Sequence, residues 1–337
     1  MRRTFTICLL SLLPLLGALA QGPNQSGTYY KNADGEKGAA LKTALCGIIF
    51  DRTERTYDDL WTDFQKTDKR ADGKVWDMYS NSTNYEFSIH QDPGSGGKKE
   101  GEFYNREHSW PNSWFGKKVQ PMFTDLFHVY PTDKFVNNKR GNHPFGETKG
   151  SYTSNNNFSK LGSCTYPGYT GTVFEPNDEY KGDFARTYFY MVTCYEEKLH
   201  DWYVNYGVNN SNNETKNAVM ATLDGNTYPG LSSWQLSMLM KWAKNDPVSE
   251  KEINRNNAVY DIQENRNPFI DYPGLEEYIW GDKKDVAFSY DNYTSGIATI
   301  PVSVKNTADI YTISGQRVKG HLPKGIYIRG GKKFVVK

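Results

Sequence analysis

Glu107 and His108 form an adjacent acid–imidazole pair within the aromatic stretch Tyr104–Phe115. A carboxylate oxygen is a hard ligand that suits Mg²⁺, and a neutral imidazole beside it can take a proton from water near pH 7. Adjacent side chains on a strand point to opposite faces, so both reach one site only where the strand ends or bends. Pro111 indicates such an end. The pair therefore predicts a metal-assisted proton-transfer site at the end of a strand.

A helix is expected shortly afterwards in the chain. Thr132 or Asp133 can cap its start, and Gly141 marks its end. Asn137 would lie about one and a half turns into this helix, and its amide oxygen is an uncharged metal ligand. Arg140 follows three residues later on the same helix face. A strand–loop–strand–helix unit would present these residues and the acid–imidazole pair to one pocket.

Each of these residues also has an ordinary structural interpretation, and bulk composition does not decide between the two. A single histidine is more often a structural hydrogen-bonding residue than a catalyst, and an asparagine in a helix is usually solvated. The net charge is +1, and removal of Arg2 and Arg3 with residues 1–20, which hold no acids, changes it to −1. Bulk charge therefore neither supports nucleic-acid binding nor argues against an enzyme that binds it locally.

The N-terminus has the three parts of a secretory signal. Arg2 and Arg3 are followed by the apolar run Thr6–Leu16 and by the small-residue cleavage pattern Ala18–Ala20. The apolar run is shorter than the ~20 residues needed to span a bilayer, and no later segment is apolar enough to do so. We expect residues 1–20 to be removed.

Three cysteines would remain in the mature chain: Cys46, Cys164 and Cys194. This odd number leaves one disulfide plus one free thiol open, and spacing does not determine the pairing. The absence of a CxxC spacing argues against a cysteine zinc site.

The chain predicts an α+β body in which helices dominate, followed by a small all-β module. The alternation in Val75–Ile89 is typical of strands, and the residues from Thr299 onward repeat β-rich segments separated by turn signals. The predicted helices are Glu36–Phe50, Asp58–Gln65, Asp183–Glu197, Ser233–Lys244 and one that begins near Glu250. The expected divisions are a signal peptide at 1–20, a catalytic domain at 21–282, a linker at 283–298 and the β module at 299–337.

The stretch REHSWPNSWFG at 106–116 closely resembles the signature of the bacterial endonuclease I family of secreted or periplasmic nucleases. Three further blocks resemble the same family in the same order: 125–147, Lys181–Glu196 and Asn254–Gly281. Together the blocks span roughly residues 40–281, and they match long aromatic-rich strings instead of an isolated dipeptide.

The resemblance implies a ββα-metal (His-Me finger) nuclease core inside the mostly helical body. The residue that matches His108 would be the general base, and those that match Glu107 and Asn137 would hold one Mg²⁺, Mn²⁺ or Ca²⁺ ion. The implied activity is hydrolysis of DNA, with RNA left open, at little sequence specificity and with 5′-phosphate products. We expect a monomer that contacts the phosphate backbone.

The phosphate-binding arginine is less easily assigned. Some family members carry it between the first two blocks, but the intervening residues 116–124 contain only Lys117 and Lys118. Arg140 and Arg186 are the remaining candidates, and each could instead be a structural ion-pair residue.

The segments 309–318, 322–327 and 332–337 resemble a C-terminal sorting domain of the type IX secretion system. The resemblance implies that secretion machinery binds this module. It also implies that the protein reaches the outer-membrane surface or the medium, with the periplasm as the alternative. An ordinary β appendage is the other interpretation.

Two further functions come from other classes. One is a non-catalytic extracellular protein that binds nucleic acid or glycan through tyrosine and tryptophan side chains. The other is a phosphodiesterase for small or lipid substrates. The intact set Glu107, His108 and Asn137 favours the nuclease over the first, and nicking of plasmid DNA would separate it from the second.

Overall fold

The computed structural model describes residues 22–293 and four strands near the C-terminus, and it divides the chain into the units Met1–Tyr293 and Thr294–Lys337. The expected signal segment at 1–20 and residues 294–298 of the expected linker lie outside the described residues. None of the helices in the described part is long and apolar enough to cross a membrane.

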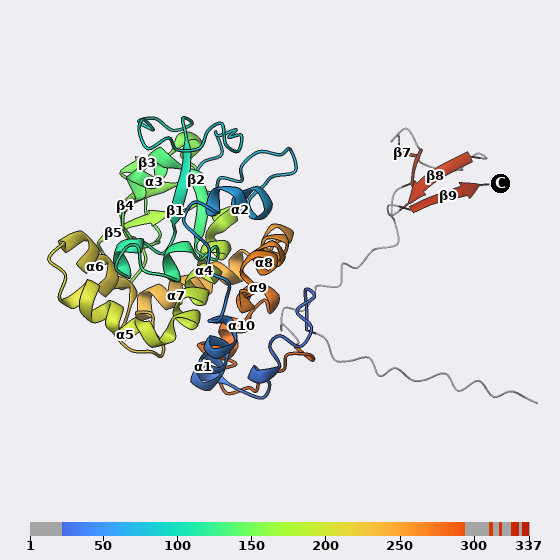
Figure 1. Ribbon diagram of the computed structural model, residues 1–337. Helices are drawn as coiled ribbons and strands as arrows, with labels where there is room; N and C mark the ends of the chain where they lie inside the picture. Colours follow the sequence, from blue (N-terminus) through green and yellow to red (C-terminus); the bar gives the residue numbers. More distant parts are fainter. Residues whose placement is uncertain (1–21, 294–309, 313–316, 319–324, 330–331, 337) are drawn as a thin grey trace, which may run out of the picture. The chain divides into compact units, whose positions relative to one another are not determined.

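The first unit combines helices with two small antiparallel sheets, which confirms the α+β class (Figure 1). Its strands are β1 (Tyr104–His108) paired with β2 (Val129–Asp133), and β3 (Tyr152–Thr153), β4 (Lys160–Ser163) and β5 (Thr172–Glu175) in that order. Its helices are α1 (Gly38–Ile49), α2 (Leu60–Thr67), α3 (Lys134–Arg140), α4 (Lys181–Cys194), α5 (Leu199–Trp202), α6 (Asn213–Thr222), α7 (Ser233–Asn245), α8 (Glu250–Gln263), α9 (Pro268–Asp271) and α10 (Leu275–Ile279). Helices α1, α2, α4, α7 and α8 confirm the predicted helices within a few residues at each end.

Helix α4 runs through the core of the first unit (Figure 1). Every residue of α4 after Lys181 is buried, and the helix packs against α1, α7 and α9. Its aromatic side chains contact rings from several parts of the chain, for example Tyr188 against Trp110 at 4.9 Å and Tyr190 against Phe127 at 4.7 Å between centroids. A helix without a polar face can only be stable in such an interior position.

The β1–β2–α3 segment has the strand–loop–strand–helix order that was predicted. The two strands are antiparallel, with Tyr104 opposite Asp133 and His108 opposite Val129. Helix α3 starts directly after β2, and the Asp133 side chain caps it by accepting a hydrogen bond from the Val136 amide at 2.8 Å. The helix ends at Gly141, whose φ of 58° favours glycine. The end of β1 and the middle of α3 are thereby placed side by side.

The prediction of strands in Val75–Ile89 is wrong. This segment consists of turns with a single bridge between Lys69 and Val75. The carboxylate of Asp77 accepts hydrogen bonds from the Tyr79 amide at 2.8 Å and from the Thr83 hydroxyl at 3.0 Å. These local hydrogen bonds fold the backbone into a turn. The segment therefore cannot pair with a neighbouring strand.

Residues 283–293, the first part of the expected linker at 283–298, belong to the first unit. Phe288 is 1% exposed, and its backbone exchanges hydrogen bonds with Gly35 at 2.7 Å and Glu36 at 2.8 Å. The Tyr293 ring packs against Tyr272 at 5.0 Å between centroids. Aromatic side chains thus fix a stretch whose composition is otherwise typical of a linker.

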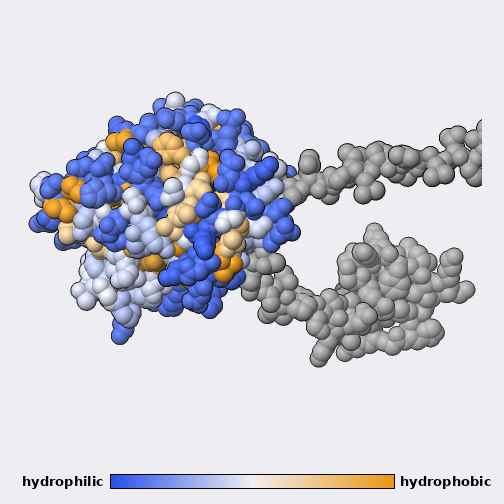
Figure 2. Space-filling model, turned by 90° about the horizontal axis from the view of Figure 1, so that it is seen from below, coloured by the Kyte–Doolittle hydropathy of each residue, from blue (hydrophilic) through white to orange (hydrophobic). Residues whose placement is uncertain are grey.

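The described strands of the second unit form an antiparallel sheet in the order β7-β6-β8-β9. Their bounds are β6 (Ile310–Thr312), β7 (Arg317–Val318), β8 (Gly325–Arg329) and β9 (Lys332–Val336). On the face of the first unit seen in Figure 2, hydrophilic residues predominate and apolar residues form small separate patches.

Two truncations test where the folded body ends. Removal of residues 294–337 should leave the free energy of unfolding of the first unit unchanged, whereas removal of 283–337 should lower it by at least the ~3–5 kcal/mol expected for loss of a buried phenylalanine. Urea denaturation of both variants measures the difference. Equal stabilities would contradict the assignment of residues 283–293 to the body.

Candidate active site

The end of β1 borders a hollow of about 170 Å³. All four residues singled out from the sequence line it: Glu107, His108, Asn137 and Arg140. Glu107 and His108 reach the same hollow although they are adjacent, because His108 is the last residue of the strand.

Helix α3 lies against the face of β1 that carries Asn105 and Glu107. The Asn137 Nδ2 donates to Asn105 Oδ1 at 2.9 Å, and the Arg140 Nη1 donates to Glu107 Oε1 at 2.6 Å. Residues two apart on the strand therefore meet residues three apart on the helix. Because side chains repeat every two residues on a strand face and every three to four on a helix face, the side chains of β1 and α3 meet at one end of the strand.

Glu107 is 3% exposed, and its two carboxylate oxygens differ in their surroundings. Oε1 accepts from the Tyr79 hydroxyl at 2.8 Å and from Arg140. Burial raises the pKa of Glu107, while the Arg140 charge and these two hydrogen bonds oppose the rise. No described residue donates a hydrogen bond to Oε2. That oxygen is therefore the one available to a ligand in the hollow.

His108 has a defined tautomer. Its Nε2 lies 2.9 Å from the Phe123 carbonyl oxygen. Because a carbonyl oxygen can only accept, Nε2 carries the proton and Nδ1 keeps a lone pair. The ring stacks on Phe123 at 5.2 Å between centroids, and burial together with nearby His128 lowers the pKa of His108 to about 3. The imidazole is therefore neutral at neutral pH and can accept a proton.

Asn137 and Glu107 together offer oxygen ligands that fit a divalent ion. Donation from Nδ2 to Asn105 orients the Asn137 amide and leaves its Oδ1 without a hydrogen bond from any described residue. A hard ion such as Mg²⁺ accepts few protein oxygens and completes its shell with water. Within residues 22–293, no group of three or more His, Cys, Asp or Glu side chains could hold a metal ion. A site at this position would therefore use Glu107, Asn137 and water.

Arg140 is 1% exposed, and its contacts hold α3 against the end of β1. Besides Glu107, it donates from Nη1 to the His108 carbonyl at 2.9 Å and from Nη2 to the Ser109 carbonyl at 2.6 Å. Arg186, the other candidate for binding phosphate, does not line the hollow. Its guanidinium instead pairs with Glu252 at 2.5 Å.

Three contributors to the site were not predicted from the sequence. Arg106 and Tyr57 line the hollow, and the guanidinium carbon of Arg106 lies 3.4 Å from the centroid of the Tyr57 ring and 4.2 Å from that of Trp61. Arg106 precedes Glu107 directly, but the rings that hold it, Tyr57 and Trp61, lie far from it in the chain. Tyr79, which holds Glu107, lies in a segment that was predicted to be strand, and no motif marks it.

The cysteines make no contribution to the hollow. Cys46, Cys164 and Cys194 are all free thiols in the described structure. The disulfide left open by the sequence is thus not formed among them.

Comparison with known proteins identifies the family. The endonuclease I family model matches residues 37–274. The chain is similar to an extracellular ribonuclease of Bacillus amyloliquefaciens, with 36% identity over 260 residues, which is 75% of this chain and 78% of that protein. An extracellular ribonuclease of Bacillus subtilis (strain 168) shares 34% identity over 273 residues, 79% of this chain and 82% of that protein. Endonuclease-1 of Buchnera aphidicola shares 24% over 155 residues, 46% of this chain and 47% of that protein. These matches confirm the resemblance of the four sequence blocks, and the chain is a nuclease that belongs to the endonuclease I family.

Proposed function

We propose that this chain hydrolyses phosphodiester bonds at the hollow, with His108 as general base and one divalent ion held by Glu107 and Asn137. The observation that carries the proposal is the hydrogen bond from His108 Nε2 to the Phe123 carbonyl. It leaves Nδ1 as the basic atom of a neutral imidazole, and His108 lines the same hollow as Glu107, whose Oε2 has no partner among the described residues. The antiparallel β1–β2 pair followed by α3 supports a ββα-metal core.

In this proposal His108 Nδ1 takes a proton from water, and the resulting hydroxide attacks phosphorus in line. Arg140 and Tyr79 keep the Glu107 carboxylate in place through bonds to Oε1. A bound Mg²⁺, Mn²⁺ or Ca²⁺ would stabilise negative charge on the phosphate and on the leaving 3′ oxygen. The products would carry 5′-phosphate and 3′-hydroxyl ends.

Arg106 is the group we propose for phosphate binding. Its guanidinium carbon lies 3.4 Å from the centroid of the Tyr57 ring and 4.2 Å from that of Trp61, and its Nη1 donates to the Tyr57 carbonyl at 2.5 Å and to the exposed Asp58 carboxylate at 3.3 Å. The stacking fixes a charge that is 15% exposed and lines the hollow. A planar cation held in this way suits recognition of a phosphate oxygen.

We propose that the substrates include both RNA and DNA. Two of the similar proteins are named extracellular ribonucleases and a third Endonuclease-1. Contacts to phosphate carry no sequence information, so cleavage should show little sequence preference.

We also propose that the protein acts outside the cell. The support is the signal-like segment at 1–20 and the names of the extracellular relatives. The β module at 299–337, whose described strands form one antiparallel sheet, would serve as the type IX sorting module. Residues 21–293 would then form the catalytic body.

The first test is cleavage of plasmid DNA and of RNA by wild-type protein and by His108→Ala. We expect Mg²⁺-dependent cleavage by the wild type, its loss in EDTA, and a fall of about 10²–10⁴-fold in kcat for His108→Ala, because a positioned base contributes that much. His200→Ala is the matched control, since this exposed histidine lies outside the hollow. A folded His108→Ala with full activity would exclude His108 as the base. Failure of the wild type to cleave either polymer would favour small phosphodiesters.

A second test compares Asn137→Ala with Asn138→Ala. The two residues are neighbours on α3, but Asn137 lines the hollow whereas Asn138 is exposed and does not. The Mg²⁺ concentration for half-maximal activity should rise about tenfold or more for Asn137→Ala and stay unchanged for Asn138→Ala. Identical Mg²⁺ titrations of the two variants would remove Asn137 from the ion site.

A third test measures the coupling between Arg140 and Glu107. Arg140→Met should lower the free energy of unfolding by about 3–5 kcal/mol, because it leaves a buried carboxylate without its counter-charge. The double variant Arg140→Met/Glu107→Gln should lose less than the sum of the two single losses. Additive losses in urea denaturation would show that the pair does not hold the site together.

A further inference from the structure

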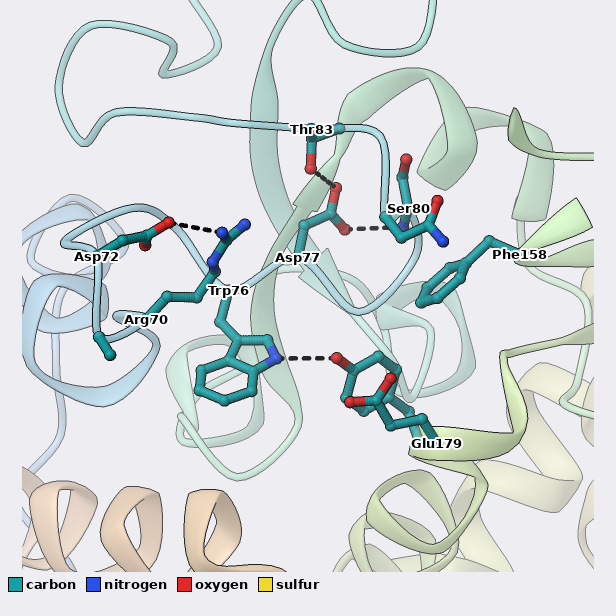
Figure 3. Close-up of a pocket in the computed structure, with 11 residues that line it drawn as sticks. Arg70, Asp72, Trp76, Asp77, Ser80, Thr83, Phe158 and Glu179 are labelled. Carbon is teal, nitrogen blue, oxygen red and sulfur yellow. Dashed lines mark hydrogen bonds and ion pairs between the residues drawn. The ribbon is translucent and has the colours of Figure 1, made fainter. Parts of the chain in front are cut away.

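A second, larger cavity lies between the 70–83 segment and the start of α4. Its volume is about 520 Å³, and Trp76, Phe158 and Tyr180 form its aromatic lining. Figure 3 shows Trp76 and Phe158 in the same space as the polar side chains of Arg70, Asp77 and Ser80. Sites for small flat molecules have this size and this mixture of rings with a few polar groups.

The aromatic lining is held in place before any ligand arrives. Trp76 Nε1 donates to the Tyr180 hydroxyl at 3.0 Å, and the Phe158 and Tyr180 rings meet edge to face at 6.1 Å between centroids. The Lys251 ammonium lies 5.5 Å from the centroid of the Trp76 ring and 4.9 Å from that of Tyr180. Tyr180 and Phe158 are buried, whereas Trp76 is only half-buried. The Trp76 ring is thus a rigid, accessible stacking surface.

The charged groups of the cavity select against phosphate. Asp72 and Glu179 line it, and so does Asp77, but burial raises the pKa of Asp77 to about 7 and its oxygens already accept from the Tyr79 amide and the Thr83 hydroxyl. The single cation in the lining, Arg70, pairs with Asp72 at 2.6 Å. The excess of carboxylates repels a phosphate group. A nucleobase is uncharged, stacks on an aromatic face and offers N–H donors that carboxylate oxygens accept.

The cavity is close to the proposed catalytic hollow along the chain. Trp76 is three residues from Tyr79, so their Cα atoms are at most roughly 11 Å apart. The Tyr79 hydroxyl in turn donates to Glu107 Oε1 at 2.8 Å. The segment that lines the cavity therefore also holds the Glu107 carboxylate of the hollow, through a residue whose Cα lies within roughly 11 Å of that of Trp76.

We propose that this cavity binds one unpaired nucleobase of the substrate strand, stacked on Trp76, a few nucleotides from the bond that is cut. The proposal rests on the nuclease function proposed above. It predicts tighter binding of single-stranded than of fully paired substrate, because a base within a duplex cannot enter the cavity without leaving its stack.

The test is ¹⁹F NMR of the full mature chain labelled with 5-fluorotryptophan, in the His108→Ala background so that the probe is not cut. The Trp76 signal is assigned by its loss in Trp76→Phe. A single-stranded DNA 12-mer and the free nucleosides guanosine and cytidine should each shift this signal. The signal of Trp280, which packs between Phe189 and Phe269 and does not line the cavity, should stay in place.

A kinetic arm uses Trp76→Leu with Tyr169→Leu as the matched control. Tyr169 is also a half-buried aromatic residue, but it stacks on Trp234 outside this cavity. Loss of one stacked base should raise KM for single-stranded substrate about fivefold to a hundredfold in Trp76→Leu, while kcat and the KM of the control stay near wild type. If Trp76→Leu does not fold, the ¹⁹F NMR experiment still tests whether the cavity binds a base.

The outcomes separate the two proposals. An unmoved Trp76 signal at saturating 12-mer, in a protein whose wild type cleaves nucleic acid, would overturn the base pocket and leave the nuclease function intact. Inorganic phosphate that moves the signal as strongly as the nucleosides would also overturn it, since the cavity would then be an anion site. A Trp76 shift in a protein without nuclease activity would support the pocket and contradict the proposed function.

Discussion

The buried guanidinium of Arg140 is the interaction on which the geometry of the hollow depends. Moving a cation from water into the protein interior costs free energy unless acceptors in the protein replace the lost water. Arg140 donates hydrogen bonds to one carboxylate oxygen and to two backbone carbonyls. Those carbonyls belong to His108 and Ser109, at the point where β1 ends. The Ser109 carbonyl also accepts from the Tyr188 hydroxyl of α4 at 3.2 Å. The strand end is therefore tied both to α3 and to the central helix.

In this arrangement the two faces of β1 have different roles. The face with Asn105 and Glu107 meets α3 and carries Glu107, one of the two proposed ion ligands. The opposite face carries Arg106 and His108 on the aromatic side formed by Tyr57 and Phe123 rings. Only at the end of the strand can groups from both faces meet one substrate. The distance between Glu107 and His108, the proposed ion ligand and the proposed base, is thus set by strand geometry.

The sequence predicted the part of this site that local rules control. The adjacent pair at a strand end, the cap at Asp133 and the stop at Gly141 follow from hydrogen bonding and φ preference, which act over a few residues. The strand prediction for 75–89 failed because the Asp77 carboxylate takes the amides that a ladder would need. The role of Tyr79 and the packing of residues 283–293 depend on contacts between residues distant in the chain. Arg106 was missed because its position depends on the rings of Tyr57 and Trp61, which lie far from it in the chain.

The charged residues of the hollow determine how strongly it would attract a divalent ion. Glu107 is its only carboxylate, and Arg140 already neutralises that charge at 2.6 Å. Asn137 adds an oxygen without charge. A divalent cation placed between them would meet little net attraction from the protein, in contrast to sites with several carboxylates. A phosphodiester brings the missing negative charge, so ion and substrate should each bind better in the presence of the other. The pairing of Glu107 with Arg140 therefore leaves the positive charge of Arg106 in the lining, which favours the arrival of a phosphodiester together with the ion.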